Sequence, residues 1–412
     1  MRAPRFHSAI IDARLRTAWI SVVVLIVTAC QSSETGSSER FVRETRGDTT
    51  VIRTVAGSVW GDSVRLVEEL RIGRGEAEGP TAFGDIRAIA VDPGGEIYVY
   101  DGSSQQLRMF DSTGRYLRAI GRVGSGPGEY RDVTALAIHQ TGDLLARDPA
   151  LQQIHRYMPT GTPVTSWRLP SGLYDANSLM TDTAGIVYAT ILTGPIVPNA
   201  PWPMGTTRFD SSGRLLDTFP APRWLGATSD PGPYDPEVLW TWGASGDQVT
   251  AFGANYKVDL RHPNGTVTRI ERSGVMPVPV PEAERAELMA VLEARQQEPD
   301  EVGGATPPSI PREKPLLRAI LSGLDGRVWV RTSLASRSSD VTVDTSLPLA
   351  RRPRRWTEDF AWDVFESTGR YLGRITLPTR AEPHVMRGDR IWGIVRDADD
   401  VPSVVRWKIT MK

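Results

Sequence analysis

Cysteine and lysine are almost missing from this chain of 412 residues, and histidine is scarce. Cys30 is the only cysteine, so the chain cannot form an internal disulfide or a metal–thiolate cluster. Only four lysines accompany 44 arginines, and 49 acidic residues balance these basic ones. A net charge of −1 gives no general attraction to nucleic acid, so we expect no nucleic-acid partner.

The first 29 residues are typical of a secretory signal peptide. Four arginines precede an apolar stretch over residues 18–27, which is shorter than the roughly 20 residues that a membrane-spanning helix needs. The sequence Val27-Thr28-Ala29-Cys30 resembles the lipobox of bacterial lipoproteins. That resemblance implies a lipidated Cys30 as the mature N-terminus and a location in the bacterial cell envelope, with the outer membrane indicated by Gln31. The alternative is a plain signal peptide or a short anchor with an incidental cysteine.

Residues 30–63 are expected to form the lipidated N-terminus and a flexible tether. From Gln31 to Asp48 the chain is rich in Ser, Thr, Glu and Arg and has almost no apolar residues. Such a segment cannot bury enough apolar surface to fold alone. We therefore place the folded domain at residues 64–410.

An internal repeat dominates this domain. The sequence Phe-Asp-Ser-Thr-Gly-Arg-Tyr-Leu at 110–117 returns with few changes at 209–216 and at 365–372, and each copy predicts a β-hairpin. Four short strands in about 35 residues are the size of one propeller blade. Turn glycines 19 residues apart mark three of the blades, at Gly95 and Gly114, Gly142 and Gly161, and Gly246 and Gly265.

These spacings predict an all-β fold, a six-bladed β-propeller with four-stranded antiparallel blades. The last unit, around Gly388, lacks its outer strand, whereas residues 64–72 have a fourth-strand pattern with no strands before them. We expect this N-terminal strand to complete the sixth blade and close the ring. Closure would remove an exposed sheet edge, which otherwise invites aggregation.

Two elements of the repeat resemble those of NHL-type six-bladed β-propellers. They are the connection Gly126-Pro127-Gly128-Glu129-Tyr130 and the Phe-Asp-x-x-Gly hairpins. The resemblance covers about residues 64–410 and implies the same fold. It does not imply one function, because the fold hosts lyases, lactonases, protein-binding modules and surface lipoproteins.

Two insertions interrupt the repeat. Residues 281–295, within an insertion over about 275–315, predict a helix because a proline precedes strong helix formers with apolar residues near i, i+3 and i+4. We expect this helix to pack on one face of the ring, and the alternative is a lid over the channel. The second insertion, residues 333–358, carries Arg351-Arg352-Pro353-Arg354-Arg355, which is a solvated loop or a contact to an anionic surface.

Three aspartates stand at one offset in successive blades. Asp85, Asp132 and Asp175 each precede a turn glycine by ten residues, which places them at one radius around the mouth of the central channel. Such an arc of carboxylates could hold a cation, and its oxygen ligands would suit calcium as a cofactor. The alternative is that each aspartate closes a turn by accepting hydrogen bonds from nearby backbone N–H groups.

Other side chains are weaker candidates at the channel mouth. Trp240 and Trp242 point to the same face of a first strand, so they line a ligand shelf or, as we favour, pack between blades. His384 is the one histidine in a predicted first strand, and one histidine does not make a zinc site. No Gly-x-Ser-x-Gly sequence is present to place a nucleophilic serine, so no catalytic residue is assigned.

The sequence therefore predicts a membrane-anchored envelope lipoprotein whose propeller binds a small ligand or a protein without catalysis. Two alternatives remain open. One is a metal-dependent, lactonase-like or lyase-like hydrolase working at the central channel. The other is a structural scaffold of the envelope.

Overall fold

The computed structural model describes residues 39–61, 64–73, 75, 77–171, 178–197, 202–224, 232–296, 309–338 and 355–411. All of them belong to one compact unit, Gly36–Lys412. The signal segment, Cys30 and the run from Arg351 to Arg354 lie outside the described residues. No helix in the described part of the chain is long and apolar enough to span a bilayer.

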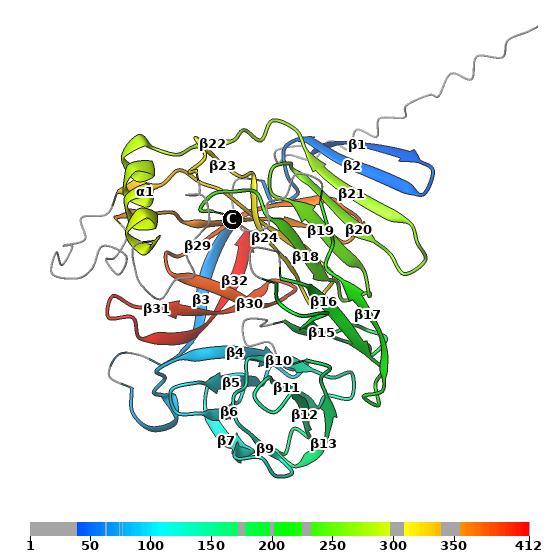
Figure 1. Ribbon diagram of the computed structural model, residues 1–412, viewed down its shortest axis with the longest axis vertical. Coiled ribbons are helices and arrows are strands. Elements are labelled where there is room, and N and C mark those ends of the chain that lie inside the picture. Colours follow the sequence, from blue (N-terminus) through cyan, green and yellow to red (C-terminus); the bar gives the residue numbers. More distant parts are fainter. Residues whose placement is uncertain are drawn as a thin grey trace, which may run out of the picture. The chain divides into compact units, whose positions relative to one another are not determined.

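Six small sheets of antiparallel strands are arranged in a ring, one sheet for each blade, which confirms the predicted six-bladed propeller (Figure 1). First strands of neighbouring blades contact each other, as β4 does with β10 and β30. Blades one to three are β4 (Ile86–Val91), β5 (Ile97–Asp101), β6 (Gln106–Phe110) and β7 (Tyr116–Ile120); β10 (Ala135–Ile138), β11 (Leu144–Asp148), β12 (Gln153–Tyr157) and β13 (Pro163–Arg168); and β14 (Leu179–Thr181), β15 (Val187–Leu192), β16 (Met204–Phe209) and β17 (Leu215–Pro220).

Blades four to six complete the ring. They are β18 (Val238–Trp242), β19 (Gln248–Phe252), β20 (Lys257–Arg261) and β21 (Val267–Arg272); β24 (Leu317–Ser322), β25 (Val328–Thr332), β28 (Phe360–Phe365) and β29 (Tyr371–Leu377); and β30 (Ala381–Arg387), β31 (Arg390–Arg396), β32 (Pro402–Met411) and β3 (Val64–Ile72). Short elements in the connections are η1 (Gly79–Thr81), β8 (Arg122–Val123) with β9 (Glu129–Tyr130), β22 (Val278–Pro279) with β23 (Glu313–Lys314), and β26 (Arg337–Ser338) with β27 (Trp356–Thr357).

The repeated hairpin is built alike in different blades. Its turn glycine has a φ of 86° at Gly114 and 88° at Gly213 and Gly369, a conformation that disfavours any residue with a Cβ atom. Asp111 accepts hydrogen bonds of 3.0 Å from the backbone N–H groups two and four residues later. Asp210 accepts the same two bonds at the same length. These residues therefore form the turn, as the sequence predicted.

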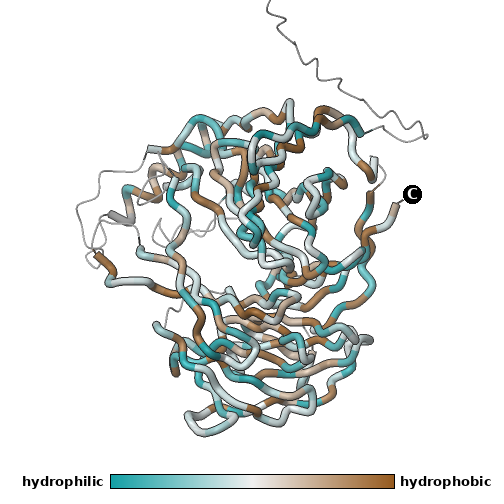
Figure 2. The backbone as a smooth tube through the Cα atoms, turned by 90° about the vertical axis from the view of Figure 1, so that its right-hand side faces the viewer, coloured by the Kyte–Doolittle hydropathy of each residue, from teal (hydrophilic) through white to brown (hydrophobic). Residues whose placement is uncertain are grey.

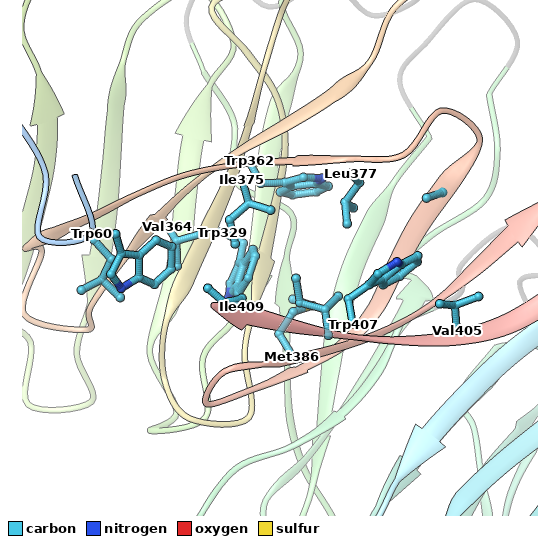
Figure 3. Packing of buried hydrophobic residues seen from close by; sticks show 13 residues of the cluster. Trp60, Trp329, Trp362, Val364, Ile375, Leu377, Met386, Val405, Trp407 and Ile409 are labelled. Carbon is cyan, nitrogen blue, oxygen red and sulfur yellow. The ribbon is translucent and has the colours of Figure 1, made fainter. Parts of the chain in front are cut away.

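The N-terminal strand β3 closes the ring. It pairs antiparallel with β32, from Val64 opposite Met411 to Ile72 opposite Val404, so both ends of the domain share blade six. Hydrophobic and hydrophilic residues are interleaved along the strands (Figure 2). A cluster of buried apolar side chains packs between blades five and six, and it contains Trp60, Trp329, Trp362 and Trp407 (Figure 3). Each large apolar side chain buried in this way contributes about 1.5–3 kcal/mol.

Residues 40–56 correct the expectation of a tether that extends to residue 63. β1 (Arg40–Arg46) and β2 (Thr49–Ala56) form a hairpin, and β2 pairs in parallel with β21, which extends blade four to six strands. Ile52 and Thr54 are the buried residues of this hairpin. The two strands were not predicted, because the segment is polar and has few apolar residues. They gain their stability from pairing with blade four rather than from a core of their own.

The helix α1 (Glu282–Gln296) occupies nearly the residues that were predicted to be helical. Figure 1 places it beside blade five, away from the first strands at the centre of the ring. Glu284 is buried and accepts hydrogen bonds from Tyr234 over 2.5 Å and from Ser336 over 2.9 Å. The helix therefore packs against the ring and does not cover the channel.

Candidate functional site

The first strands all begin on one face of the ring, which we term the mouth face. Because successive strands run in opposite directions, the turns between second and third strands also lie on this face. The Phe-Asp-x-x-Gly hairpins lie on the opposite face. Asp85 directly precedes β4 and Asp132 shortly precedes β10, so both belong to the mouth face. Asp175 lies outside the described residues.

Arg87, on β4, joins these two aspartates. Its Nε atom is 2.7 Å from Oδ2 of Asp85, and its Nη1 atom is 2.5 Å from Oδ1 of Asp132. Arg396 of blade six places Nη2 3.7 Å from the other carboxylate oxygen of Asp85. The hydrogen bond to Asp85 raises the pKa of the Arg87 guanidinium above its ordinary value. Counting residues aligned the aspartates, but it missed the arginine that pairs with both.

Two guanidinium groups therefore face the two carboxylates. A cation at this position would be repelled by both of them and would have to displace them from the carboxylates. Among the described residues, no three His, Cys, Asp or Glu side chains are grouped so that they could hold a metal ion. The turn that leads into β4 is closed by a different aspartate, Asp101, which accepts a hydrogen bond from the backbone N–H of Asp85 over 2.8 Å. The calcium site remains a prediction.

Trp242 packs between blades three and four. It is 7% exposed, its ring stacks on that of Tyr188 at 4.5 Å between centres, and its Nε1 donates to Oγ1 of Thr206 over 3.0 Å. Trp240, on the same strand, is half-buried. Trp242 thus belongs to the core, and Trp240 remains the candidate for contact with a ligand.

His384 is a bulged residue of β30, the first strand of blade six. Its side chain is accessible to water. Although water reaches the side chain, the protein atoms around it disfavour the charged form and lower the pKa of the imidazole to about 4. His384 is therefore neutral at pH 7 and can donate and accept hydrogen bonds.

A chain of hydrogen bonds in blade two has the composition of a hydrolytic triad. Oγ of the exposed Ser166 is 3.0 Å from Nδ1 of His155, and Nε2 of His155 is 3.4 Å from Oδ2 of the buried Asp148. In blade one, Asp101 and Arg108 occupy the same two positions, seven residues apart, with 3.5 Å between their charged atoms. Because Asp148 and Asp101 hold equivalent positions, we interpret both as structural residues. Each pairs with the side chain seven residues later, which is His155 in blade two and Arg108 in blade one.

Comparisons with known proteins bear on the fold. A family model described as a 6-bladed beta-propeller, DUF5128, matches residues 80–185. No curated protein matches the chain. The chain is a six-bladed β-propeller.

Several solved structures are similar to this propeller. A member of the DUF4221 family from Bacteroides vulgatus is 11% identical, with a TM-score of 0.49 over 85% of this chain and 99% of that one. Virginiamycin B lyase from Staphylococcus aureus is 13% identical, with a TM-score of 0.42 over 84% of this chain and 100% of that one. A gluconolactonase from Xanthomonas campestris is 11% identical, with a TM-score of 0.39 over 86% and 92%. At such identities the likeness concerns the fold, and no activity follows from it.

Proposed function

We propose that this protein is a lipid-anchored propeller of the bacterial cell envelope that binds a small ligand or a protein on its mouth face without catalysis. The observation that carries this proposal is the bridge from Arg87 to Asp85 and Asp132. The bridge links the segments that lead into the first strands of blades one and two. The charges on this surface are therefore paired with each other, which suits recognition of a polar partner. A metal-dependent hydrolase would instead need its carboxylates free for the cation.

Site-specific photo-crosslinking in living cells tests the choice of face. A benzophenone amino acid is placed at Gln105, in the second-to-third turn of blade one, or at Ser112, in the hairpin on the opposite face. Both positions are exposed. A discrete adduct from position 105 that is missing from position 112 is expected. Equal adducts from both positions, or none from position 105, would contradict binding on the mouth face.

The anchor is supported by the lipobox-like sequence that ends at Cys30. Replacing Cys30 by serine should move the protein from the membrane fraction to the soluble fraction and abolish labelling with a radioactive fatty acid. Unchanged fractionation of Cys30→Ser would show that the apolar segment itself acts as the anchor.

A further inference from the structure

Asp363, on β28 of blade five, is completely buried and accepts five hydrogen bonds. Nη1 of Arg272 is 2.5 Å from Oδ2, while Nε and Nη2 of Arg374 are 2.8 and 3.1 Å from Oδ1 and Oδ2. The hydroxyl groups of Tyr256 and Tyr371 donate over 2.6 and 3.0 Å. Burial alone would raise the pKa of Asp363, but the bonds and charges of the two arginines lower it below its ordinary value. We call these five residues the Asp363 cluster.

The Asp363 cluster has a net positive charge, because two arginines share one aspartate. Burial raises the pKa of Tyr256 well above its ordinary value, and the Tyr371 pKa is raised for the same reason, so both tyrosines are neutral. Within the described part of the chain, neither Arg272 nor Arg374 pairs with a second carboxylate. The Arg272 side chain is 19% exposed, whereas the Arg374 side chain is exposed to water. The charge of Arg272 is thus largely removed from water, which is costly unless an anion balances it.

Within a single blade, one cation is enough to pair an aspartate. On the same strand as Arg272, Arg269 pairs one to one with Asp259 through two bonds of 2.7 Å. In blade one, Asp101 is likewise paired with the single cation Arg108. Arg272 reaches Asp363 from the neighbouring blade as a second cation, and its remaining N–H groups can bind an anion.

Two cavities adjoin these arginines. One has a volume of about 460 Å³ and is lined by residues 275–279 together with Leu316 and Leu334. The other has a volume of about 510 Å³ and is lined by Gly57, Ser58 and Tyr371. The wall of the first cavity is mainly apolar. Met276, which belongs to this wall, is 75% exposed. Volumes of this size are those of small-molecule sites.

We propose that the cleft between blades four and five binds an amphipathic anion. Its carboxylate or phosphate head would pair with Arg272 and Arg374, because a guanidinium matches two oxygens of either group. Its apolar chain would lie along residues 275–279. This inference rests on the proposed function for its biological role, and it adds the class of ligand.

The test is a calorimetric titration of the full-length chain in a non-ionic detergent, with the heats of detergent alone subtracted. The probes are octanoate, octyl phosphate, octanol and inorganic phosphate. Arg272→Gln is the main variant, since Asp363 would keep Arg374 as a partner. Arg269→Gln is its control, because it removes a paired arginine from the same strand. Met276→Asp brings a negative charge to an exposed position of the wall, and Met158→Asp, 46% exposed in blade two, is its control.

Octanoate and octyl phosphate should bind at least about tenfold more tightly than octanol or inorganic phosphate, since both the head and the chain contribute. Arg272→Gln and Met276→Asp should each weaken octanoate binding about tenfold or more, and both controls should leave it unchanged. Octanol binding as tightly as octanoate would overturn the anion site, and inorganic phosphate binding as tightly as octyl phosphate would overturn the apolar part. Octanoate binding that neither variant weakens would overturn the location. None of these outcomes depends on the crosslinking experiment, so the two proposals can fail separately.

Discussion

Arg87 of blade one donates a hydrogen bond to Asp132 of blade two over 2.5 Å, so the pair spans the boundary between two blades at the mouth of the channel. The Arg87 side chain is 41% exposed, and an ion pair this open to solvent contributes at most about 1 kcal/mol to stability. Its importance lies in the charge that it brings to the mouth face. A carboxylate that would attract a cation is paired instead with a residue of the neighbouring blade.

The Asp363 cluster predicts an order of stabilities. Asp363→Asn should lower the free energy of unfolding by about 3 kcal/mol, because it leaves the half-buried Arg272 and the exposed Arg374 without their shared carboxylate. Arg272→Gln should lower it by clearly less, because Arg374 and two tyrosines still bond to Asp363. Urea unfolding followed by circular dichroism measures both. The opposite order would refute the charge count.

The turn aspartates predict a pH dependence. Hydrogen bonds from Thr113 and Arg115 hold the pKa of Asp111 well below its ordinary value. A carboxylate with a lowered folded-state pKa stabilises the fold above its unfolded-state pKa of about 4 and loses this contribution as the pH falls further. Asp111→Asn should therefore be less stable than the wild type at pH 7, and the difference should shrink below about pH 4.

Glu366 provides the matched control for this effect. It holds the same position in the blade-five hairpin, but its carboxylate accepts a hydrogen bond only from the hydroxyl of Thr368, over 3.2 Å, among the described residues. Glu366→Gln should therefore change stability little at either pH. Urea unfolding at several pH values makes the comparison, and an equal loss in both variants would argue against the turn bonds as the cause.

The two N-terminal segments should differ in importance. Deleting residues 40–56 removes the β1–β2 hairpin but leaves blade four with its own four strands, so a lowered yet cooperative thermal transition is expected. Deleting residues 64–72 removes β3, opens the ring and exposes the edge of β32. The second variant should lose its cooperative transition and aggregate. Equal behaviour of the two deletions would show that the ring does not need β3.

His384 should titrate far from its ordinary range. Its folded-state pKa is lowered to about 4, compared with about 6.5 in an unfolded chain. Between these values the unfolded state binds a proton that the folded state does not, so the fold loses stability as the pH falls from 6.5 to 4. His384→Asn should lose less stability over this range. Nuclear magnetic resonance of the imidazole gives the midpoint directly, and a midpoint near 6.5 would show that the protein around His384 does not shift its pKa.

The blade register could be predicted because it depends on local chemistry. Residues such as Gly95 and Gly114 take positive φ values that other residues avoid, so their spacing in the sequence reflects the spacing of turns. The likeness of residues 64–72 to a fourth strand identified them as the missing strand of blade six. Each of these inferences uses residues within a single blade or a repeat of its pattern.

Contacts between distant residues could not be predicted in the same way. Arg272 and Asp363 are 91 residues apart, and Arg53 of the N-terminal hairpin pairs with Glu271, 218 residues later. Such pairs depend on which blades become neighbours and where the side chains point. The offset of the mouth aspartates was visible in the sequence, whereas the direction of the Arg87 side chain between them was not.

The most direct test of the account is a calorimetric titration of the full-length chain with millimolar calcium, repeated on Asp132→Asn and Arg87→Met. If the mouth face is a charge-paired binding surface, the wild type should give no saturable heat and no shift of its melting temperature. Arg87→Met, which removes the arginine shared by both carboxylates and leaves only Arg396 near Asp85, should be the variant in which any calcium binding appears. Saturable heat in the wild type that Asp132→Asn abolishes would contradict the account and restore the metal-dependent enzyme.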